Sequence, residues 1–227
     1  MGIGQLKYRK KEVIGFDPDK FIDAYNATYD TDRKEGYTQK KTFAPSTVGY
    51  GHGKCARYWY LAFTGVDFED TADYKAKGSM ENGTAVHERV QERMNKMDGN
   101  YKVIKHETEM ISSNPPIRGY RDSLILDLEN NIEIPFEIKS MKDEKFSVKK
   151  ELLIPEDNHL IQLLIYMKIS GHDVGAFFYE NKNDQDKIII KIEMNEENEK
   201  LINYVFDWLR GVYKLYEDKT LPNRAFE

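Results

Sequence analysis

The sequence predicts a mixed α/β domain in which a central sheet is flanked by helices. Apolar residues recur with a helical period near residues 81–97 and with a strand-like period from about residue 101 onward. The expected elements then follow in the order helix, three strands, helix, two strands and helix, which is typical of a mixed α/β fold. The length of 227 residues suggests one domain, or at most two small ones.

The N-terminal part of the chain is expected to be largely helical. Residues 17–30 start with Asp17 as the N-cap and Pro18 at the first helical position. Residues 31–45 are polar and predict a loop, and the Pro-Ser-Thr sequence at its end indicates another helix start. The next helix is predicted over residues 81–97, with four apolar residues on one stripe: Val86, Val90, Met94 and Met97.

Three strands are predicted after this helix. Residues 101–111 form the first strand, and the Asn-Pro-Pro sequence at 114–116 ends it. Residues 119–128 and 131–139 form the next two, joined by a tight turn at residues 129–131. In the third strand apolar residues alternate, so the opposite face carries Glu133, Pro135, Glu137 and Lys139.

The C-terminal third adds two helices and a pair of strands. Residues 157–170 are predicted to be helical, with Gly171 after the helix end. Residues 174–181 and 186–194 form two strands around a polar turn. Residues 196–217 form the last helix, because their apolar residues recur at the spacing of a buried helical face.

Composition narrows the class of protein. Hydrophobic residues make up 40% and charged residues 32%, which excludes a disordered chain, a collagen-like fibre and a disulfide-stapled miniprotein. No apolar run is long enough for a membrane span, and the N-terminus lacks the apolar region of a signal peptide. The one cysteine, Cys55, cannot alone hold zinc or an iron–sulfur cluster. We therefore expect a cytoplasmic setting or another reducing intracellular compartment.

Net charge does not decide the partner. The charge of −5 argues weakly against a nucleic-acid binder. Basic residues nevertheless cluster at residues 7–11 and again between Lys139 and Lys150. These clusters are either solvated faces or a local basic groove on an acidic protein, which could bind phosphates.

Three residues of the predicted hairpin suggest metal chemistry. Glu137 and Lys139 lie on the same side of one strand, and Asp122 lies on the strand before it. Two adjacent carboxylates repel each other unless a cation lies between them, so they form a natural Mg²⁺ or Mn²⁺ site. A lysine beside that site could orient water for metal-assisted phosphodiester hydrolysis. As a bare pattern, however, a surface salt bridge explains the same residues.

Four motifs in order carry a resemblance to a known family. The sequence Gly-Thr-Ala-Val-His-Glu lies at 83–88 and Gly-Tyr-Arg-Asp at 119–122. Glu-Ile-Lys follows at 137–139, and a helix carries Gln162 and Tyr166. Together they resemble the PD-(D/E)xK nuclease superfamily, and within it the RecB-type, Cas4-like exonuclease branch. The resemblance implies a restriction-endonuclease-like core, with residues 1–78 as a helical DNA-binding extension and residues 79–227 as the nuclease core.

The resemblance also implies roles for individual residues. The catalytic residues would be Asp122, Glu137 and Lys139. The metal ligands would be His87, Asp122, Glu137 and the carbonyl of Ile138. Gln162 and Tyr166 are expected to approach the DNA or the active site, and Ser46 and Arg57 are candidate phosphate contacts, because a helix start and a guanidinium both favour anions. An iron–sulfur cluster, frequent in this branch, is not expected, because Cys55 is the one cysteine.

Residue spacing agrees with part of this assignment. His87 borders the apolar stripe of its helix and should point toward the sheet, although a core histidine bonded to a neighbour would fit as well. Gln162 and Tyr166 are four residues apart and share a helical face, where the alternative role of the glutamine is to cap a backbone group. Glu107 or Glu109 could assist the metal, but we expect both to face solvent.

The expected function is a divalent-metal-dependent DNA nuclease that uses Mg²⁺ or Mn²⁺. An exonuclease on DNA ends or single strands is favoured, and exposed aromatic residues could stack unpaired bases. The alternatives are a site-specific or structure-specific endonuclease of the same superfamily, and a domain that binds DNA ends without cutting. The resemblance suggests a bacterial or phage-infected cell as the setting, and it leaves the oligomeric state open.

Overall fold

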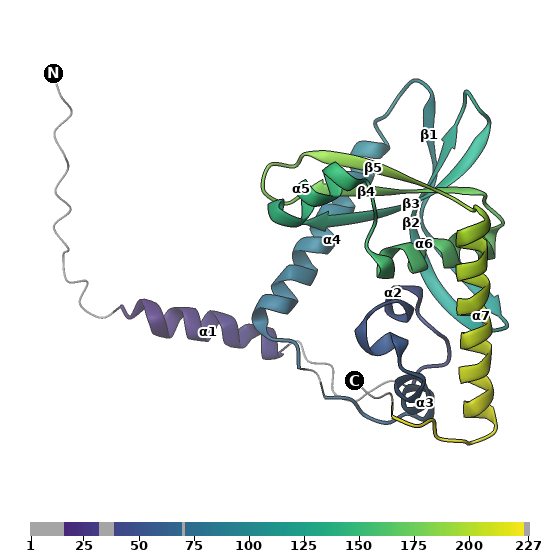
Figure 1. Cartoon of the computed structure of the whole chain (residues 1–227). Coiled ribbons are helices and arrows are strands. Elements are labelled where there is room, and N and C mark those ends of the chain that lie inside the picture. The colour runs from purple at the N-terminus through teal and green to yellow at the C-terminus, as the bar shows by residue number, and fades with distance from the viewer. Residues whose placement is uncertain (1–15, 32–38, 70, 225–227) are drawn as a thin grey trace.

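A five-stranded sheet organises the chain, and the computed structural model describes it within residues 16–31, 39–69 and 71–224. The strands are β1 (Tyr101–Ser113), β2 (Pro116–Asp127), β3 (Ile132–Met141), β4 (Val174–Asn181) and β5 (Lys187–Glu193). They lie in sequence order, and all neighbours are antiparallel except β3 and β4, which are parallel (Figure 1). The parallel pair needs a crossover, which α5 (Asp143–Leu152) and α6 (Asp157–Ser170) supply. The predicted mixed α/β fold is confirmed.

Short-range hydrogen bonds explain the turn between β2 and β3. The Asp127 carboxylate accepts hydrogen bonds from the backbone amides of Glu129 and Asn130 and from the Asn130 side chain. Such a side-chain bond to the following backbone is the usual reason that aspartate favours turns. Asn131 completes the turn with φ of 54°, a left-handed conformation that asparagine tolerates.

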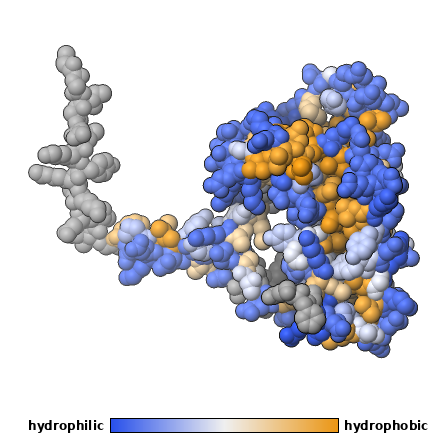
Figure 2. Space-filling model, in the orientation of Figure 1, coloured by the Kyte–Doolittle hydropathy of each residue, from blue (hydrophilic) through white to orange (hydrophobic). Residues whose placement is uncertain are grey.

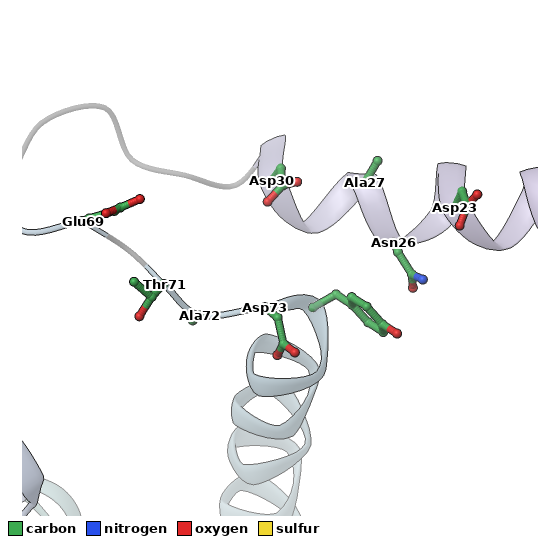
Figure 3. Close-up of a pocket in the computed structure, with 9 residues that line it drawn as sticks. Asp23, Asn26, Ala27, Asp30, Glu69, Thr71, Ala72 and Asp73 are labelled. Carbon is green, nitrogen blue, oxygen red and sulfur yellow. The ribbon is translucent and has the colours of Figure 1, made fainter.

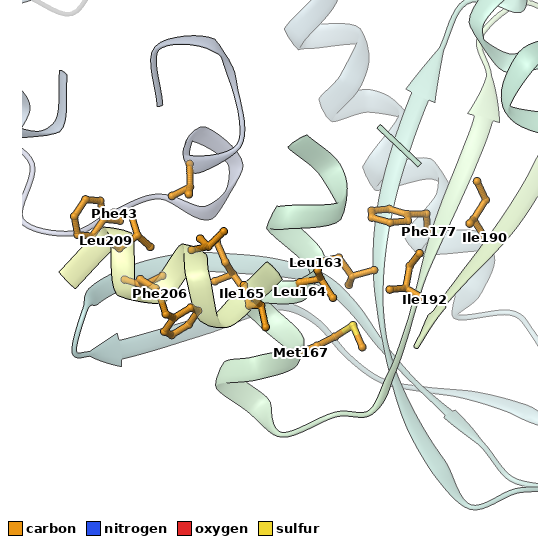
Figure 4. Packing of buried hydrophobic residues seen from close by; sticks show 14 of the residues in the cluster. Phe43, Leu163, Leu164, Ile165, Met167, Phe177, Ile190, Ile192, Phe206 and Leu209 are labelled. Carbon is orange, nitrogen blue, oxygen red and sulfur yellow. The ribbon is translucent and has the colours of Figure 1, made fainter. Parts of the chain in front are cut away.

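One large apolar cluster fills the space between the sheet and the helices α6 and α7 (Glu196–Glu217), as Figure 4 shows. Leu163, Leu164 and Met167 of α6 are fully buried in it. Gly171 ends α6 in a left-handed conformation, as its position in the sequence predicts. The helix is therefore fixed against the sheet, and its polar residues have fixed positions as well.

The opposite face of the sheet is covered by α4 (Tyr74–Met94), whose Val90 and Met94 pack on Ile125 and Ile138. The prediction of a helix over residues 81–97 is wrong at both ends. Asp73 caps the helix by accepting a hydrogen bond from the Ala76 amide, so the helix begins well before residue 81. It ends at Met94, which leaves Met97 outside the helix and 43% exposed rather than on the buried stripe.

The N-terminal helices are divided between the periphery and the core. Helix α1 (Pro18–Thr31) extends from the body and meets α4, where Lys77 donates a hydrogen bond to the Tyr29 carbonyl (Figure 1). Helix α2 (Pro45–Val48), the short helix η1 (Gly51–Lys54) and α3 (Ala56–Thr64) lie against α6 and α7 and share their apolar cluster. The expected boundary after residue 78 falls inside α4, and the basic cluster at residues 7–11 lies outside the described residues.

Helix α5 was missed in the sequence because it has almost no apolar stripe. Only Phe146 is buried, whereas Val148 and Leu152 are more than half exposed. Figure 2 shows apolar side chains at the surface around α5, β4 and β5, with hydrophilic residues over much of the rest of that face. Within the described part of the chain, no helix is long and apolar enough to cross a bilayer.

Candidate active site

The site lies where β2 and β3 separate. These strands pair from Asp127 and Ile132 as far as Ser123 and Phe136, and beyond that point β3 pairs with β4 alone. Asp122 is the first residue of β2 past the last pair, and its Oδ2 accepts a hydrogen bond of 2.7 Å from the Ile138 amide. The carboxylate thus takes the place of the missing strand contact and is held at the opening of the sheet.

Glu137 is the most deeply placed acid of the site, with a relative exposure of 0%. Its Oε2 accepts hydrogen bonds from Lys139 Nζ at 3.0 Å and from Gln162 Nε2 at 2.8 Å. Its Oε1 is buried and has no hydrogen-bond partner among the described residues. A buried carboxylate oxygen without a partner is costly, so this atom calls for a ligand that the protein chain does not supply.

Gln162 of α6 positions Glu137 from the opposite side, and Tyr166 of the same helix lines the cavity. Gln162 accepts a hydrogen bond from Lys139 Nζ at 3.2 Å through Oε1, so its amide bridges the lysine and Glu137. Relative exposures of 6% for Gln162 and 2% for Tyr166 leave little of either side chain accessible. The structure brings both residues to the site through contacts with protein groups, and their contact with DNA stays a prediction.

Helix α4 brings an imidazole to the same place. His87 Nδ1 lies 3.5 Å from Asp122 Oδ1, and the side chain is 28% exposed, so the histidine points to the sheet as predicted. His87, Glu107 and Asp122 each offer a ligand atom within 4.8 Å of the others. Gln91, one turn after His87, donates to both the Glu107 carboxylate and the Asp122 carbonyl. Helix α4 therefore fixes the positions of His87, Glu107 and Asp122, the first by carrying it and the other two through Gln91.

Glu107 is exposed, as we expected, but its carboxylate also lies beside His87 and Asp122, the position from which it could assist a metal. It lies on β1 with φ of 45°, a left-handed conformation that is strained for a glutamate. The hairpin register could have revealed it. Ser113 pairs with Pro116, and counting six residues back and six forward brings Glu107 opposite Asp122. Gln91 gave no signal in the sequence.

Burial dominates the electrostatics of the site. Loss of hydration, and then repulsion by Asp122, raises the pKa of Glu137 to about 8. Burial also raises the pKa of Asp122, against the attraction of His87 and Lys139. Burial lowers the pKa of Lys139, but attraction by Glu137 and Asp122 outweighs it and leaves the pKa above its usual value. The cluster thus holds more negative charge than its own cations can stabilise.

A cavity of about 620 Å³ gives access to this cluster. Its walls include His87, Asp122 and Lys139 together with Ser46 of α2. Gly119 permits the close approach of the walls, because a Cβ there would lie 2.7 Å from the Tyr166 hydroxyl and 2.8 Å from Pro45 Cδ. A side chain at this position would clash with both walls, which explains why the Gly-Tyr-Arg-Asp motif begins with glycine.

The remaining candidates for binding DNA lie in two different places. Ser46 lines the cavity, whereas Arg57 does not and instead donates a hydrogen bond to the Pro222 carbonyl. In the basic run, Lys149 pairs with Glu156 at 3.2 Å and Lys150 with Asp186 at 2.6 Å. Their contacts with phosphates stay predictions.

A second cavity of about 590 Å³ lies between α1 and the start of α4 (Figure 3). Its lining is acidic, with Asp23, Asp30, Glu69 and Asp73. Asp73 is engaged as the α4 cap, and Asp30 lies 4.0 Å from Lys77. The negative lining disfavours a phosphate, so this cavity does not compete with the site at Asp122.

The donor set of the site fits a hard divalent cation. Carboxylates from three strands and one imidazole gather at the site, and Mg²⁺ and Mn²⁺ prefer such oxygen-rich sets. The unpartnered Oε1 of Glu137 is the observation that supports the fit. Among the described residues, His87, Glu107 and Asp122 are the three whose ligand atoms lie within 4.8 Å of one another. Glu137 is not in that group, although it is close enough to Asp122 for repulsion between the two carboxylates. That Glu137 binds the ion stays a prediction.

The fold and site define the class of the protein as an α/β domain with the restriction-endonuclease-like fold, the fold of PD-(D/E)xK nucleases. It is similar to the alkaline exonuclease LHK-Exo of Laribacter hongkongensis, with a TM-score of 0.57 and 14% identity over 78% of this chain and 91% of that chain. A second structure, LHK-Exo in complex with dAMP, has a TM-score of 0.58 and 14% identity over 78% of this chain and 89% of that one. No family model and no curated protein matches the sequence.

Proposed function

We propose that this protein is a divalent-metal-dependent DNA nuclease of the PD-(D/E)xK superfamily, in its RecB-type branch. An exonuclease on DNA ends or on single-stranded DNA is the favoured activity. The observation that carries the proposal is the buried Oε1 of Glu137, which has no partner among the described residues. Glu137 is hydrogen-bonded to Lys139, which lines the cavity together with Asp122 and His87. The fold shared with an alkaline exonuclease, one structure of which is a complex with dAMP, supports a nucleic-acid substrate.

Asp122, Glu137, His87 and the Ile138 carbonyl would hold the ion. A divalent cation there supplies positive charge against the phosphodiester and lowers the pKa of water, so that hydroxide is available near neutral pH. The Ile138 amide and the Gln162 amide keep the two carboxylates oriented before substrate arrives. This preorganisation avoids a reorganisation cost in the transition state.

Lys139 would act on the reacting phosphate. Its ammonium stays protonated, because Glu137 and Asp122 hold its pKa above the usual value. The side chain is 19% exposed and lines the cavity, so the charged end is accessible to a phosphate oxygen or to the attacking water. The amine would orient that water and offset the negative charge that grows on phosphorus.

We also infer that the N-terminal segments before residue 79 contribute to DNA binding. Ser46 of α2 lines the cavity, and Pro45 of the same helix packs against Gly119. The α2 and α3 region shares the core of the nuclease fold, so it forms part of one compact unit with the site.

The test is a time course on end-labelled single-stranded and double-stranded DNA with Mg²⁺, Mn²⁺ or EDTA. Wild-type protein should release nucleotides only with metal, and Lys139→Ala and Glu137→Ala should lose at least about a hundredfold in rate while keeping the circular dichroism spectrum. Lys191→Ala is the matched control, since this exposed lysine on β5 pairs with Glu193 and does not line the site cavity.

Two results would overturn the proposal. Full activity of either site variant would show that the replaced residue has no catalytic role. The absence of metal-dependent products on every substrate would favour a domain that binds DNA without cutting it. Cleavage of a covalently closed circle, which has no ends, would identify an endonuclease instead of an exonuclease.

A further inference from the structure

Three alternate residues of β2 lead from the surface of the cavity to the candidate metal ligands. Arg118, Tyr120 and Asp122 occupy every second position, and all three line the same cavity. The rise of a strand places Tyr120 about 7 Å from Asp122 along the chain. The tyrosine therefore lies at the mouth of the site, next to the acid that would hold the metal.

The Tyr120 side chain is half exposed and yet fixed. Its relative exposure is 49%, and its hydroxyl donates a hydrogen bond of 3.1 Å to Glu109 Oε1. Arg118 Nε donates to the same oxygen at 2.6 Å, and Arg118 Nη2 lies 3.4 Å from the Tyr120 hydroxyl. Glu109 is directly opposite Tyr120 in the β1–β2 register. The side chains of Glu109 and Arg118 thus hold the ring at its far end.

About half of the Tyr120 residue is exposed, and it lines the cavity, where a ligand can reach it. Tyr120 makes no contact with another aromatic ring in the part of the chain that the structure describes. A large exposed ring that is already immobilised loses little conformational entropy when a second flat group stacks on it.

The charge around the ring selects the kind of ligand. Arg118 Nε lies 2.6 Å from Glu109 Oε1, so the two side chains form an ion pair and their opposite charges balance. An uncompensated arginine would attract phosphate, whereas this balanced pair leaves a flat apolar surface with no net charge. A nucleobase matches that surface, because every base offers an aromatic face for stacking.

We propose that Tyr120 forms a nucleobase-binding subsite, in which a base of the DNA substrate stacks on its ring beside the reacting phosphate. The Glu109–Arg118 pair holds the ring in place for this contact. The inference rests on the proposed function for the nature of the substrate, but it concerns binding and can be tested without cleavage.

The test uses a short single-stranded oligonucleotide that carries 2-aminopurine near one end, with Ca²⁺ or EDTA present to prevent cleavage. Stacking on wild-type protein should quench the fluorescence, and Tyr120→Leu should lose the quenching and raise Kd by about 5- to 150-fold. Tyr120→Phe keeps the ring and should stay within about threefold of wild type. An abasic nucleotide at the stacking position should remove the difference between wild type and Tyr120→Leu.

Tyr101→Leu is the matched control, because Tyr101 has the same 49% exposure but lines a different cavity. Equal binding and quenching by wild type and Tyr120→Leu would overturn the subsite. A loss in Tyr120→Phe as large as in Tyr120→Leu would overturn it too, since the hydroxyl contacts would then be responsible. Quenching without any metal-dependent cleavage would instead support the subsite and reject the nuclease proposal.

Discussion

Replacing Glu137 with glutamine should stabilise the metal-free protein at alkaline pH. The glutamine keeps the shape of the side chain and an oxygen for Lys139, but it removes a buried negative charge. In the folded protein, burial and then Asp122 raise the pKa of Glu137 from 4.5 to about 8. Because the folded pKa is raised, the stability present below pH 4.5 is lost as pH rises toward 8, where the unfolded chain is already ionised.

The size of the effect follows from that pKa. A rise in pKa from 4.5 to about 8 corresponds to roughly 5 kcal/mol of folding free energy above pH 8. For a chain of 227 residues this equals a rise in Tm of about 10–20 °C. Below pH 4.5 the two proteins should differ little, because glutamate is then neutral in both states.

Thermal unfolding in EDTA at pH 4.5 and pH 9 measures the difference. Mn²⁺ at 100 times its Kd should then stabilise wild-type protein by about 3 kcal/mol, more strongly as pH rises, because a carboxylate ligand must be deprotonated. Glu137→Gln should respond much less to Mn²⁺, having lost one ligand. Glu193→Gln is the control, since Lys191 lowers the pKa of this exposed acid and its removal should not stabilise the protein at high pH.

Two outcomes would refute this reasoning. If Glu137→Gln is no more stable than wild type at pH 9 in EDTA, the ionised Glu137 carboxylate does not destabilise the folded protein. If the variant gains as much stability from Mn²⁺ as wild type does, Glu137 is not a ligand of the ion.

Three further predictions concern other parts of the site and its supports. Glu107→Gln should weaken Mn²⁺ binding about tenfold or more in isothermal titration calorimetry, whereas Glu92→Gln, exposed on α4, should leave it unchanged. Burial and then nearby lysines lower the pKa of His159 to about 3, so stability should fall as pH drops from 6.5 toward 3. His159→Gln should reduce that loss by up to about 5 kcal/mol in urea titrations, and an unchanged acid limb would contradict the assignment. Gly119→Ala should destabilise the protein by about 1–3 kcal/mol, because its Cβ meets Tyr166 and Pro45, while Gly83→Ala on α4, with open space around it, should be neutral or stabilising.

Sheet geometry explains why so much charge can gather at one point. A continuous ladder between β2 and β3 would occupy the Ile138 amide and bring the two strands together. The two strands separate between Ser123 and Asp122, so the Ile138 amide donates to the Asp122 carboxylate instead. The separation also opens a space between the helices on the two faces of the sheet. His87 enters this space from α4 and Gln162 from α6.

The sequence by itself determined the elements whose signals are local. Alternation in β3, the Asp127 turn and Gly171 after α6 depend on neighbouring residues, and these elements lie close to their predicted bounds. The motif order also brought His87, Asp122, Glu137 and Lys139 together as candidates, and the structure places them in one cluster. Helix α5 was missed because it has almost no apolar stripe to detect.

Only the tertiary structure decided how those residues are held. Glu107 joined the site through strand register and a left-handed backbone, and Gln91 through the position of α4 over the sheet. The unpartnered oxygen of Glu137 and the fixed ring of Tyr120 depend on groups that are distant in sequence. A local pattern specifies which way a side chain leaves its strand or helix, but burial and hydrogen-bond partners are set by what packs against it from elsewhere in the chain.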